Sequence, residues 1–384
     1  MNKKTKLIII FQLIVAMFFL NIPQKAKASV YVSAQSAILM EQGSGRVLFE
    51  KEAYKPRRIA SITKIMTAIL AIESGKMDEM VKVSEKAVRA EGSSVYLKLD
   101  EKIKLEDLVY GLMLRSGNDA AVAIAEHVGG SLDGFVYLMN QKAEEIGMKT
   151  THFENPHGLD DHEKHFSTAY DMAILTRYAM NNKKYAKIAG TKVHRAPNPT
   201  ESWERKWDNK NRLLTELYEY CTGGKTGFTK RAKRTLVTTA SKEQLNLIAV
   251  TLNGPDDWND HIQMYEHGFK TYNLAEVLPK GSLEGIKEEM YKKKVYLPQG
   301  FNYPIKAGEK DLFEVEYKMK KPDERWKMGE DVPNIVGKAT VYFKNQPVKN
   351  LSIYYKQETP KEKQSFFELF RSLFTLIIGV KSDG

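Results

Sequence analysis

Cysteine is almost absent from this chain, since Cys221 is the only one among 384 residues. No disulfide can form within the chain, so its stability must come from an ordinary hydrophobic core. A lone cysteine is most often an inert small core residue, although Cys221 lies close enough to Lys225 for a bulky thiol reagent to block a cleft there. The sequence also lacks an uninterrupted apolar run of about 20 residues, the length needed to span a bilayer.

Acidic residues are absent from residues 1–28, which contain a basic head, a nearly continuous apolar run at 7–20, and Ala26 and Ala28. This order is typical of a cleaved secretory signal, so we expect the mature protein to be exported. An uncleaved membrane span is the alternative, but the run is short for that. Cleavage removes five lysines and lowers the formal charge from +11 to +6. The remaining charge suits an anionic membrane or wall and gives no reason to expect nucleic acid.

Residues 365–380, at the other end of the chain, form an amphipathic segment that follows a charged linker. Their polar positions recur every three or four residues and are Glu368, Arg371, Ser372, Thr375 and Gly379. Phenylalanine, leucine and isoleucine fill the other faces of the predicted helix. We expect this helix to anchor the protein at the outer face of the cell membrane. The alternative is a helix docked on its own protein.

The region between the two ends divides into a main domain, 29–273, and a small β-rich domain, 274–358, before the linker and anchor, 359–384. In the main domain, 32–40 and 46–49 predict a hairpin. Helical patterns follow at 61–73, 105–114, 119–128, 132–146 and 168–181, then strands at 234–240 and 245–252 and a helix at 258–272. This order predicts an α/β (α+β) domain with one sheet, packed helices and a helical subdomain. The small domain has strand patterns at 312–320, 339–343 and 348–355.

Ser61 and Lys64 stand at the start of the predicted helix 61–73. Their spacing places both side chains on one face of the first turn, so the amine can reach the hydroxyl. A serine hydroxyl becomes a good nucleophile when a base takes its proton, and lysine can be that base when its pKa is lowered. The pattern arises by chance about once or twice in a chain of this length. No other serine of this chain has lysine at the third position after it.

Two further polar motifs follow. Ser116-Gly117-Asn118 lies in a predicted loop between helices, where such residues are also common as ordinary helix caps. Lys225-Thr226-Gly227 follows two glycines, but it lacks the spacing of a phosphate-binding P-loop and leads into a strand. A lysine and a threonine on a strand beside a cleft can bind a carboxylate, and a glycine there lets a ligand lie close.

The three motifs in this order resemble those of the penicillin-recognising serine enzymes, and more narrowly the low-molecular-mass penicillin-binding proteins that are serine D-Ala-D-Ala carboxypeptidases. The resemblance covers essentially the whole chain, with further similar segments at 59–67, 118–121, 155–159, 167–171 and 209–214. It implies the penicillin-binding, serine β-lactamase-like transpeptidase fold for a catalytic domain at 29–273. The lysine-rich composition is also similar to that of the sporulation member, which trims spore-cortex peptidoglycan.

The resemblance assigns a role to each motif residue. Lys64 deprotonates Ser61, which attacks the penultimate D-Ala carbonyl of a peptidoglycan pentapeptide and forms an acyl-enzyme that water hydrolyses. Ser116 helps to move the proton to the departing D-Ala. The substrate-binding residues implied by the resemblance are Asn118, Lys225, Thr226, Gly227 and Phe228. A β-lactam would acylate the same serine, and no cofactor is implied.

Among the binding residues, Lys225 and Thr226 would hold the terminal carboxylate, and Lys225 would also help to keep Lys64 neutral. The backbone N–H groups of Ser61 and Phe228 would form the oxyanion hole. Phe228 departs from the family pattern, because relatives often carry a polar ring at this position.

Other functions remain open on the sequence alone. Residues 157–165 contain potential metal ligands, which are His157, Asp160, Asp161, His162 and His165. The spacing of the last two histidines is one residue short of a zincin helix, and the run is typical of a solvated loop, so we expect no metal. A β-lactamase would need a base for fast deacylation, for which Glu154 is the one candidate. A non-catalytic wall-binding protein would not need the intact set of polar motif residues.

Overall fold

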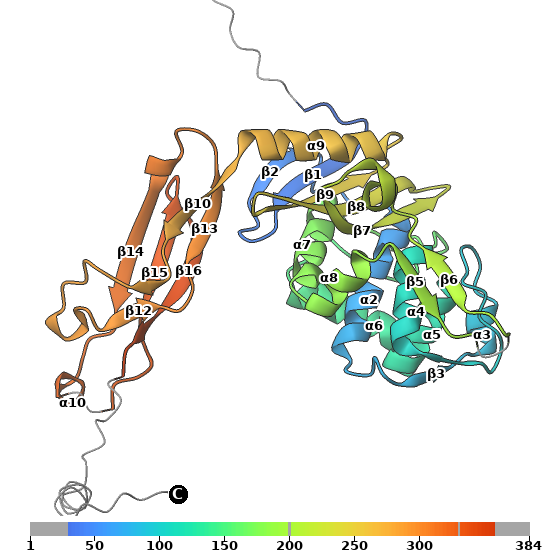
Figure 1. The fold of residues 1–384 in the computed structure, drawn as a ribbon, viewed down its shortest axis with the longest axis horizontal. Coiled ribbons are helices and arrows are strands. Elements are labelled where there is room, and N and C mark those ends of the chain that lie inside the picture. Colours follow the sequence, from blue (N-terminus) through green and yellow to red (C-terminus); the bar gives the residue numbers. More distant parts are fainter. Residues whose placement is uncertain (1–29, 199–200, 329–330, 358–384) are drawn as a thin grey trace, which may run out of the picture.

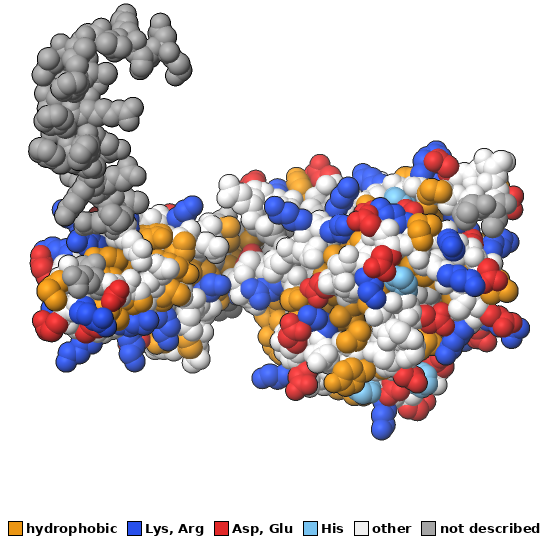
Figure 2. All heavy atoms as spheres, turned by 90° about the horizontal axis from the view of Figure 1, so that it is seen from below, with side chains coloured by type: hydrophobic (Ala, Val, Ile, Leu, Met, Phe, Trp, Pro, Cys, Tyr) orange, Lys and Arg blue, Asp and Glu red, His pale blue; other side chains and the backbone are white. Residues whose placement is uncertain are grey.

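The computed structural model describes residues 30–198, 201–328 and 331–357, so the predicted signal, 1–28, and the predicted linker and anchor, 359–384, lie outside the described residues. Two lobes are joined by a narrow waist: a larger lobe of sheet and helices, and a smaller lobe of strands (Figure 1, Figure 2). Within the described ranges, no helix is both long and apolar enough to cross a membrane.

The larger lobe is built on a five-stranded antiparallel sheet in the order β2-β1-β9-β8-β7. Its strands are β1 (Ser36–Glu41), β2 (Val47–Lys51), β7 (Cys221–Thr229), β8 (Lys233–Lys242) and β9 (Leu245–Leu252). The predicted N-terminal hairpin and the two predicted strands near 234–252 are thus confirmed. Because β7 is an edge strand, its outer side pairs with no further strand of the described sheet, and backbone groups on that side can contact a ligand.

Helices cover both faces of this sheet, which explains why β9 is buried along almost its whole length. Helix α9 (Asp257–Thr271) lies on one face, against β8 and β9 (Figure 1). The opposite side carries the 3₁₀ turn η1 (Ala60–Thr63) and the helices α2 (Lys64–Glu73), α4 (Leu105–Tyr110), α5 (Asn118–Gly129), α6 (Leu132–Glu145), α7 (Ala169–Met180) and α8 (Lys183–Ala189). Five of the predicted helices are confirmed to within about three residues.

The predicted helix 105–114 is wrong in one respect, because α4 ends at Tyr110 and a π-helical turn, η2 (Gly111–Arg115), follows it. A π turn holds an extra residue per turn, which apolar periodicity does not reveal. The sequence patterns also miss short elements, which are β3 (Met80–Lys82), α3 (Glu85–Val88), β4 (Lys102–Lys104), β5 (Val193–Ala196), β6 (Arg205–Asp208) and η3 (Leu213–Leu217).

The smaller lobe is antiparallel β structure. Its main sheet has the order β11-β12-β16-β15-β14, and a separate pair is β10-β13. The elements are β10 (Asn273–Leu278), β11 (Gly281–Ser282), η4 (Glu289–Tyr291), β12 (Val295–Leu297), β13 (Phe301–Ile305), η5 (Lys310–Leu312), β14 (Phe313–Met319), α10 (Glu324–Lys327), β15 (Ile335–Phe343) and β16 (Gln346–Tyr355). Apolar and charged residues alternate along β14, so its apolar side chains all point toward this lobe's own core.

Arg46, in the turn between β1 and β2, connects the two lobes. Its guanidinium donates to both carboxylate oxygens of Glu309 at 2.9 and 3.1 Å. It also lies 4.7 Å from the ring centre of Phe343 and 5.3 Å from that of Tyr303. Paired charges and stacked rings of this kind hold a defined geometry, so the waist is a specific contact.

Candidate active site

Ser61 lies in η1, the 3₁₀ turn that runs directly into α2. Ile62 and Thr63 beside it are buried, whereas Ser61 is partly exposed. Ala60 has a φ of 49°, a left-handed conformation that non-glycine residues rarely adopt. Backbone strain of this kind persists only where the surrounding packing enforces it, and it is concentrated at functional sites. The serine is therefore presented on a tightly constrained turn.

Two glycines allow other parts of the chain to pack against this turn. A Cβ atom at Gly227, on β7, would lie 2.9 Å from the Ser61 nitrogen and 2.4 Å from Thr235 Oγ1. A Cβ atom at Gly158 would lie 1.9 Å from the carbonyl oxygen of Ala60. Such distances leave no room for a side chain, so both positions require glycine. The close approach of β7 brings the third motif beside the serine.

Lys64 lies in the first turn of α2, and its side chain is completely buried. Its Nζ atom is 3.0 Å from Ser61 Oγ, 2.7 Å from Asn118 Oδ1 and 2.7 Å from the carbonyl oxygen of His157. Burial lowers the pKa of Lys64 well below its usual value, and the positive charges of Lys225 and Lys210 lower it further. The structure therefore favours a neutral amine at this position.

A neutral lysine has two N–H donors and one lone pair, whereas the cation has three donors. The carbonyl oxygens of Asn118 and His157 can only accept, so they take the two N–H groups of Lys64. The lone pair is then left for the hydroxyl proton of Ser61. This hydrogen-bond arrangement makes Lys64 able to act as a base toward Ser61.

Ser116 ends η2 with a left-handed φ of 66°, which turns the chain before α5 begins at Asn118. Its Oγ lies 3.1 Å from Nζ of Lys225, which also donates to the carbonyl oxygen of Thr226 at 2.8 Å. Lys225 is almost fully buried, and burial together with Lys210 lowers its pKa to about 7. The structure thus brings the second and third motifs together through a direct hydrogen bond.

These residues border an open cavity of about 310 Å³. It is lined by Ser61, Ser93, Ser116, Lys210, Thr226, Gly227, Phe228, Arg234, Asp257 and Trp258. Phe228 is 64% exposed at this border, in agreement with a place beside a bound ligand. Arg234 contacts Asp257 through a hydrogen bond of 2.6 Å and closes one side. A pocket with a serine, cations and a free strand edge can bind an anionic peptide end.

Lys210 and Asp119 belong to this site but were missed in the sequence. Lys210 lines the cavity, and burial together with Arg115 lowers its pKa. Asp119 is buried at the start of α5 and accepts hydrogen bonds from the backbone N–H groups of Val95 and Leu97. These hydrogen bonds hold the segment 95–97, which follows Ser93 at the cavity wall. The only available signals were an acidic residue at a helix start and a lysine in a motif-like segment.

The Asn118 amide also has partners within the protein, which the family resemblance did not assign. Its oxygen accepts from Lys64, and its nitrogen donates to the carbonyl oxygen of Glu91. The side chain therefore positions the base, and the second N–H of its amide can still donate to a substrate.

The interpretation of 157–165 as a solvated loop is wrong at both of its ends. His157 and His165 are buried, and burial lowers the pKa of each to about 3, so both are neutral. His165 Nδ1 accepts from the Glu154 N–H, and Nε2 lies 2.8 Å from Thr63 Oγ1. The loop thus packs against η1, the turn that carries Ser61. Among the described residues, no group of three side chains is arranged to hold a metal ion.

Glu154 and Cys221 both lie away from the reacting atoms. Glu154 pairs with His152 at 3.0 Å and is not among the residues that line the cavity. Cys221 is buried at the start of β7, and burial raises the pKa of its thiol to about 11. A thiol of this kind reacts slowly, which fits the interpretation of Cys221 as an inert core residue.

Comparison with known proteins gives a consistent result. The profile of a family described as D-alanyl-D-alanine carboxypeptidase, peptidase S11, matches residues 23–256. D-alanyl-D-alanine carboxypeptidase DacF of Bacillus subtilis is 34% identical over 303 residues, which cover 76% of this chain and 77% of DacF. DacC of Escherichia coli is 35% identical over 260 residues, covering 64% of this chain and 63% of DacC.

Solved structures are similar as well. A D-alanyl-D-alanine carboxypeptidase from Mycobacterium tuberculosis has 30% identity and a TM-score of 0.60, covering 64% of this chain and 95% of its own. Penicillin binding protein 5 from Haemophilus influenzae has a TM-score of 0.68 and covers 86% of this chain and 98% of its own. At 24% identity, the second likeness concerns the fold alone. The predicted fold of the catalytic domain is confirmed.

Proposed function

Because the chain belongs to the D-alanyl-D-alanine carboxypeptidase family, peptidase S11, we propose that Ser61 is the nucleophile with which it removes the terminal D-Ala from peptidoglycan pentapeptides. The chain is a serine-type carboxypeptidase and a penicillin-binding protein. The observation that carries the assignment of Ser61 is the neutral, buried Lys64, whose lone pair faces the serine hydroxyl at 3.0 Å.

In the acylation step, Lys64 takes the proton of Ser61, and Oγ attacks the carbonyl carbon of the penultimate D-Ala. The carbonyl oxygen becomes an oxyanion, for which we propose the backbone N–H groups of Ser61 and Phe228 as donors. Support comes from the position of β7, an edge strand that packs on the serine turn. Two preorganised donors of this kind typically lower the barrier by several kcal/mol.

The leaving D-Ala needs a proton and its carboxylate needs a positive partner. Nζ of Lys225 lies 3.1 Å from Oγ of Ser116. The Ser116 hydroxyl can therefore pass a proton to the departing amine, while the Lys225 cation stabilises the Ser116 oxygen. Lys225 and Thr226 would bind the terminal carboxylate, and Lys210, at the cavity wall, adds a second positive charge. Water then attacks the acyl-enzyme, with Lys64 again as the base.

The decisive experiment incubates a pentapeptide ending in D-Ala-D-Ala with wild-type protein and with Ser61→Ala, and measures released D-Ala. We expect release by the wild type alone, together with covalent labelling of Ser61 by a fluorescent penicillin. Ser352→Ala, an exposed serine on β16, is the matched control and should behave as wild type. Labelling of Ser61→Ala at the wild-type rate would place the nucleophile elsewhere.

A β-lactamase is the second candidate, because the same serine acylates with penicillin. Fast turnover of a chromogenic β-lactam would support it, whereas a stable acyl-enzyme supports the carboxypeptidase. The position of Glu154, which pairs with His152 away from the cavity, favours slow deacylation.

Location is a separate proposal that depends on the sequence of the two ends. We propose cleavage of 1–28, export, and attachment to the outer face of the cell membrane through 365–380, with domain boundaries near 273 and 358. A role in the spore cortex rather than in the vegetative wall stays a prediction. Flotation of the mature protein with phospholipid vesicles, compared with Phe370→Asp, tests the attachment.

A further inference from the structure

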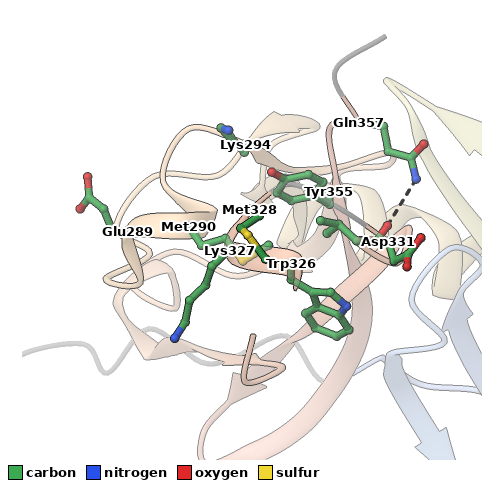
Figure 3. A pocket seen from close by; sticks show the side chains of 10 residues that line it. Glu289, Met290, Lys294, Trp326, Lys327, Met328, Asp331, Tyr355 and Gln357 are labelled. Atoms are coloured by element: carbon green, nitrogen blue, oxygen red, sulfur yellow. Dashed lines mark hydrogen bonds between the residues drawn. The ribbon is translucent and has the colours of Figure 1, made fainter. Parts of the chain in front are cut away.

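A pocket of about 530 Å³ lies in the smaller lobe, away from the active site. Apolar and aromatic side chains line it, namely those of Met290, Trp326, Val332 and Tyr355, and Figure 3 shows three of them, Met290, Trp326 and Tyr355. Figure 1 shows α10, which carries Trp326, at the end of this lobe opposite to its junction with the larger lobe. No residue of this pocket takes part in the proposed chemistry.

The rim of the pocket combines an exposed apolar side chain with lysines. Met328 is 69% exposed, the most exposed of the large apolar side chains described in the smaller lobe. Lys294 and Lys327 also line the pocket, and in Figure 3 the Lys327 chain extends away from it. Among the described residues, Lys327 pairs with Glu324, and an ion pair so exposed to water is worth little.

Carboxylates also occur at this rim, so its charge alone does not select a lipid. Glu289 and Asp331 line the pocket, and Asp331 pairs with Arg325 at 3.1 Å. The distinctive feature is the combination of tryptophan, tyrosine and methionine with long lysine chains. Aromatic rings of this kind favour the headgroup level of a bilayer, and lysines there extend their amines to the phosphates.

The chain leaves the described structure at this same place. Gln357, the last described residue, lines the pocket and donates to the carbonyl oxygen of Val332 at 3.4 Å. The amphipathic segment 365–380 begins after seven more residues, which span roughly 25–30 Å when fully extended. A helix of 365–380 lying in the membrane interface would therefore hold the pocket within that distance of the lipid headgroups.

We propose that this end of the smaller lobe is a second membrane contact, in which Met328 and Trp326 enter the headgroup region of an anionic phospholipid bilayer and Lys294 and Lys327 meet its phosphates. This contact requires that 365–380 attach to the membrane, as proposed above. The short linker gives the second contact a high local concentration at the membrane, which favours its formation. Two points of attachment then fix the orientation of the smaller lobe on the bilayer.

The test places an environment-sensitive fluorophore on Met328→Cys in the full mature chain. The buried, high-pKa thiol of Cys221 stays unlabelled. On vesicles of phosphatidylcholine and phosphatidylglycerol at 7:3, we expect a blue shift at position 328 and quenching by lipids labelled near the headgroup. The control label on Tyr137→Cys, an exposed position of α6 in the larger lobe, should not respond.

A charge placed on the contact should weaken binding. Met328→Asp is expected to lower vesicle partitioning roughly tenfold, at the lower limit of what burial of a methionine contributes. The matched control is Leu312→Asp, which changes another exposed apolar residue of the smaller lobe near Glu309 and the junction. It should change partitioning less than twofold.

Three outcomes would overturn the proposal in distinguishable ways. A silent label at 328 on protein that still floats with vesicles would leave the attachment of 365–380 standing without the second contact. The emission of the label at 328 could already be blue-shifted without vesicles and return to the wavelength of an exposed label in Phe370→Asp. That result would mean that 365–380 itself occupies the pocket. Absence of any flotation would remove the attachment proposal as well, while D-Ala release would still report the active site independently.

Discussion

The two lobes bury different kinds of side chain. The larger lobe buries Lys64 completely and Lys225 almost completely. It also holds a buried ion pair between Glu101 and Arg205, whose closest atoms are 2.7 Å apart. In the described part of the smaller lobe, Glu309 is the one charged residue that counts as buried, and it faces the junction. Its core is otherwise aliphatic and aromatic.

This difference indicates where the chemistry occurs. Burying an amine costs several kcal/mol unless it is paired with an opposite charge, and Lys64 lies near another cation. Stability cannot explain that arrangement, whereas a base with a lowered pKa requires it. The smaller lobe has no such feature, which agrees with a supporting role.

Replacing Lys64 is expected to have the largest effect. Lys64→Met keeps the length of the side chain but removes the lone pair that faces Ser61, so acylation by labelled penicillin should fall at least 100-fold. Stopped-flow measurement of the acylation rate checks this. Lys338→Met on β15 is the matched control and should acylate at the wild-type rate. Acylation of Lys64→Met within tenfold of wild type would assign the base to another group.

Gly227→Ala tests whether the strand of the larger lobe must touch the serine turn. The new Cβ would lie 2.9 Å from the Ser61 nitrogen, so β7 must move, and a displacement near 1 Å costs about 100-fold in rate. The acylation rate constant measures it. In Gly268→Ala, the new atom meets only the side-chain ends of Leu247 and Leu39. That control should lower the melting temperature without a selective loss of acylation, and equal losses in both variants would contradict the specific contact.

The pH dependence should reveal the second buried lysine. Lys225 has a pKa of about 7 and must be protonated to bind a carboxylate, so kcat/KM for a pentapeptide should fall about tenfold per pH unit above 7. Lys225→Arg keeps its charge at high pH, and its alkaline limb should vanish even if its maximum is lower. An unchanged alkaline limb in that variant would assign the titration to another group.

The same lysine links pH to stability. Its pKa is lower in the folded protein than the unfolded value of 10.5, so between pH 7 and 10.5 only the unfolded chain carries the proton. The free energy of unfolding should therefore rise with pH in this window, by up to about 1.4 kcal/mol per unit. Urea unfolding of the wild type and of Lys225→Met at pH 7 and 9 measures it, and only the wild type should show this contribution.

Local patterns drew attention to the three motifs, and the family resemblance supplied the roles of their residues, which the structure brings together. Ser61 and Lys64 share one helical turn, and amphipathic periodicity places the helices of the larger lobe. Contacts that depend on distant segments could not be predicted. Lys210 reaches the cavity because the chain after β6 folds over it, and His165 is buried because its loop packs under Thr63. Polar side chains in such a run look solvated until the tertiary partner is known.

The smallest expected effect is at the junction between the lobes. Arg46→Ala removes two hydrogen bonds to Glu309, which should lower the free energy of unfolding of the smaller lobe by about 1–3 kcal/mol, as measured by calorimetry.

Burial alone would raise the pKa of Glu309, but hydrogen bonds, chiefly from Arg46, lower it to about 2. The stabilisation by this ion pair should therefore be lost as pH falls from about 4.5 to 2. Arg325→Ala breaks an exposed ion pair with Asp331 and should change little. D-Ala release should stay within twofold of wild type, because the active site lies wholly in the larger lobe; a tenfold loss in Arg46→Ala would show that the lobes act as one catalytic unit.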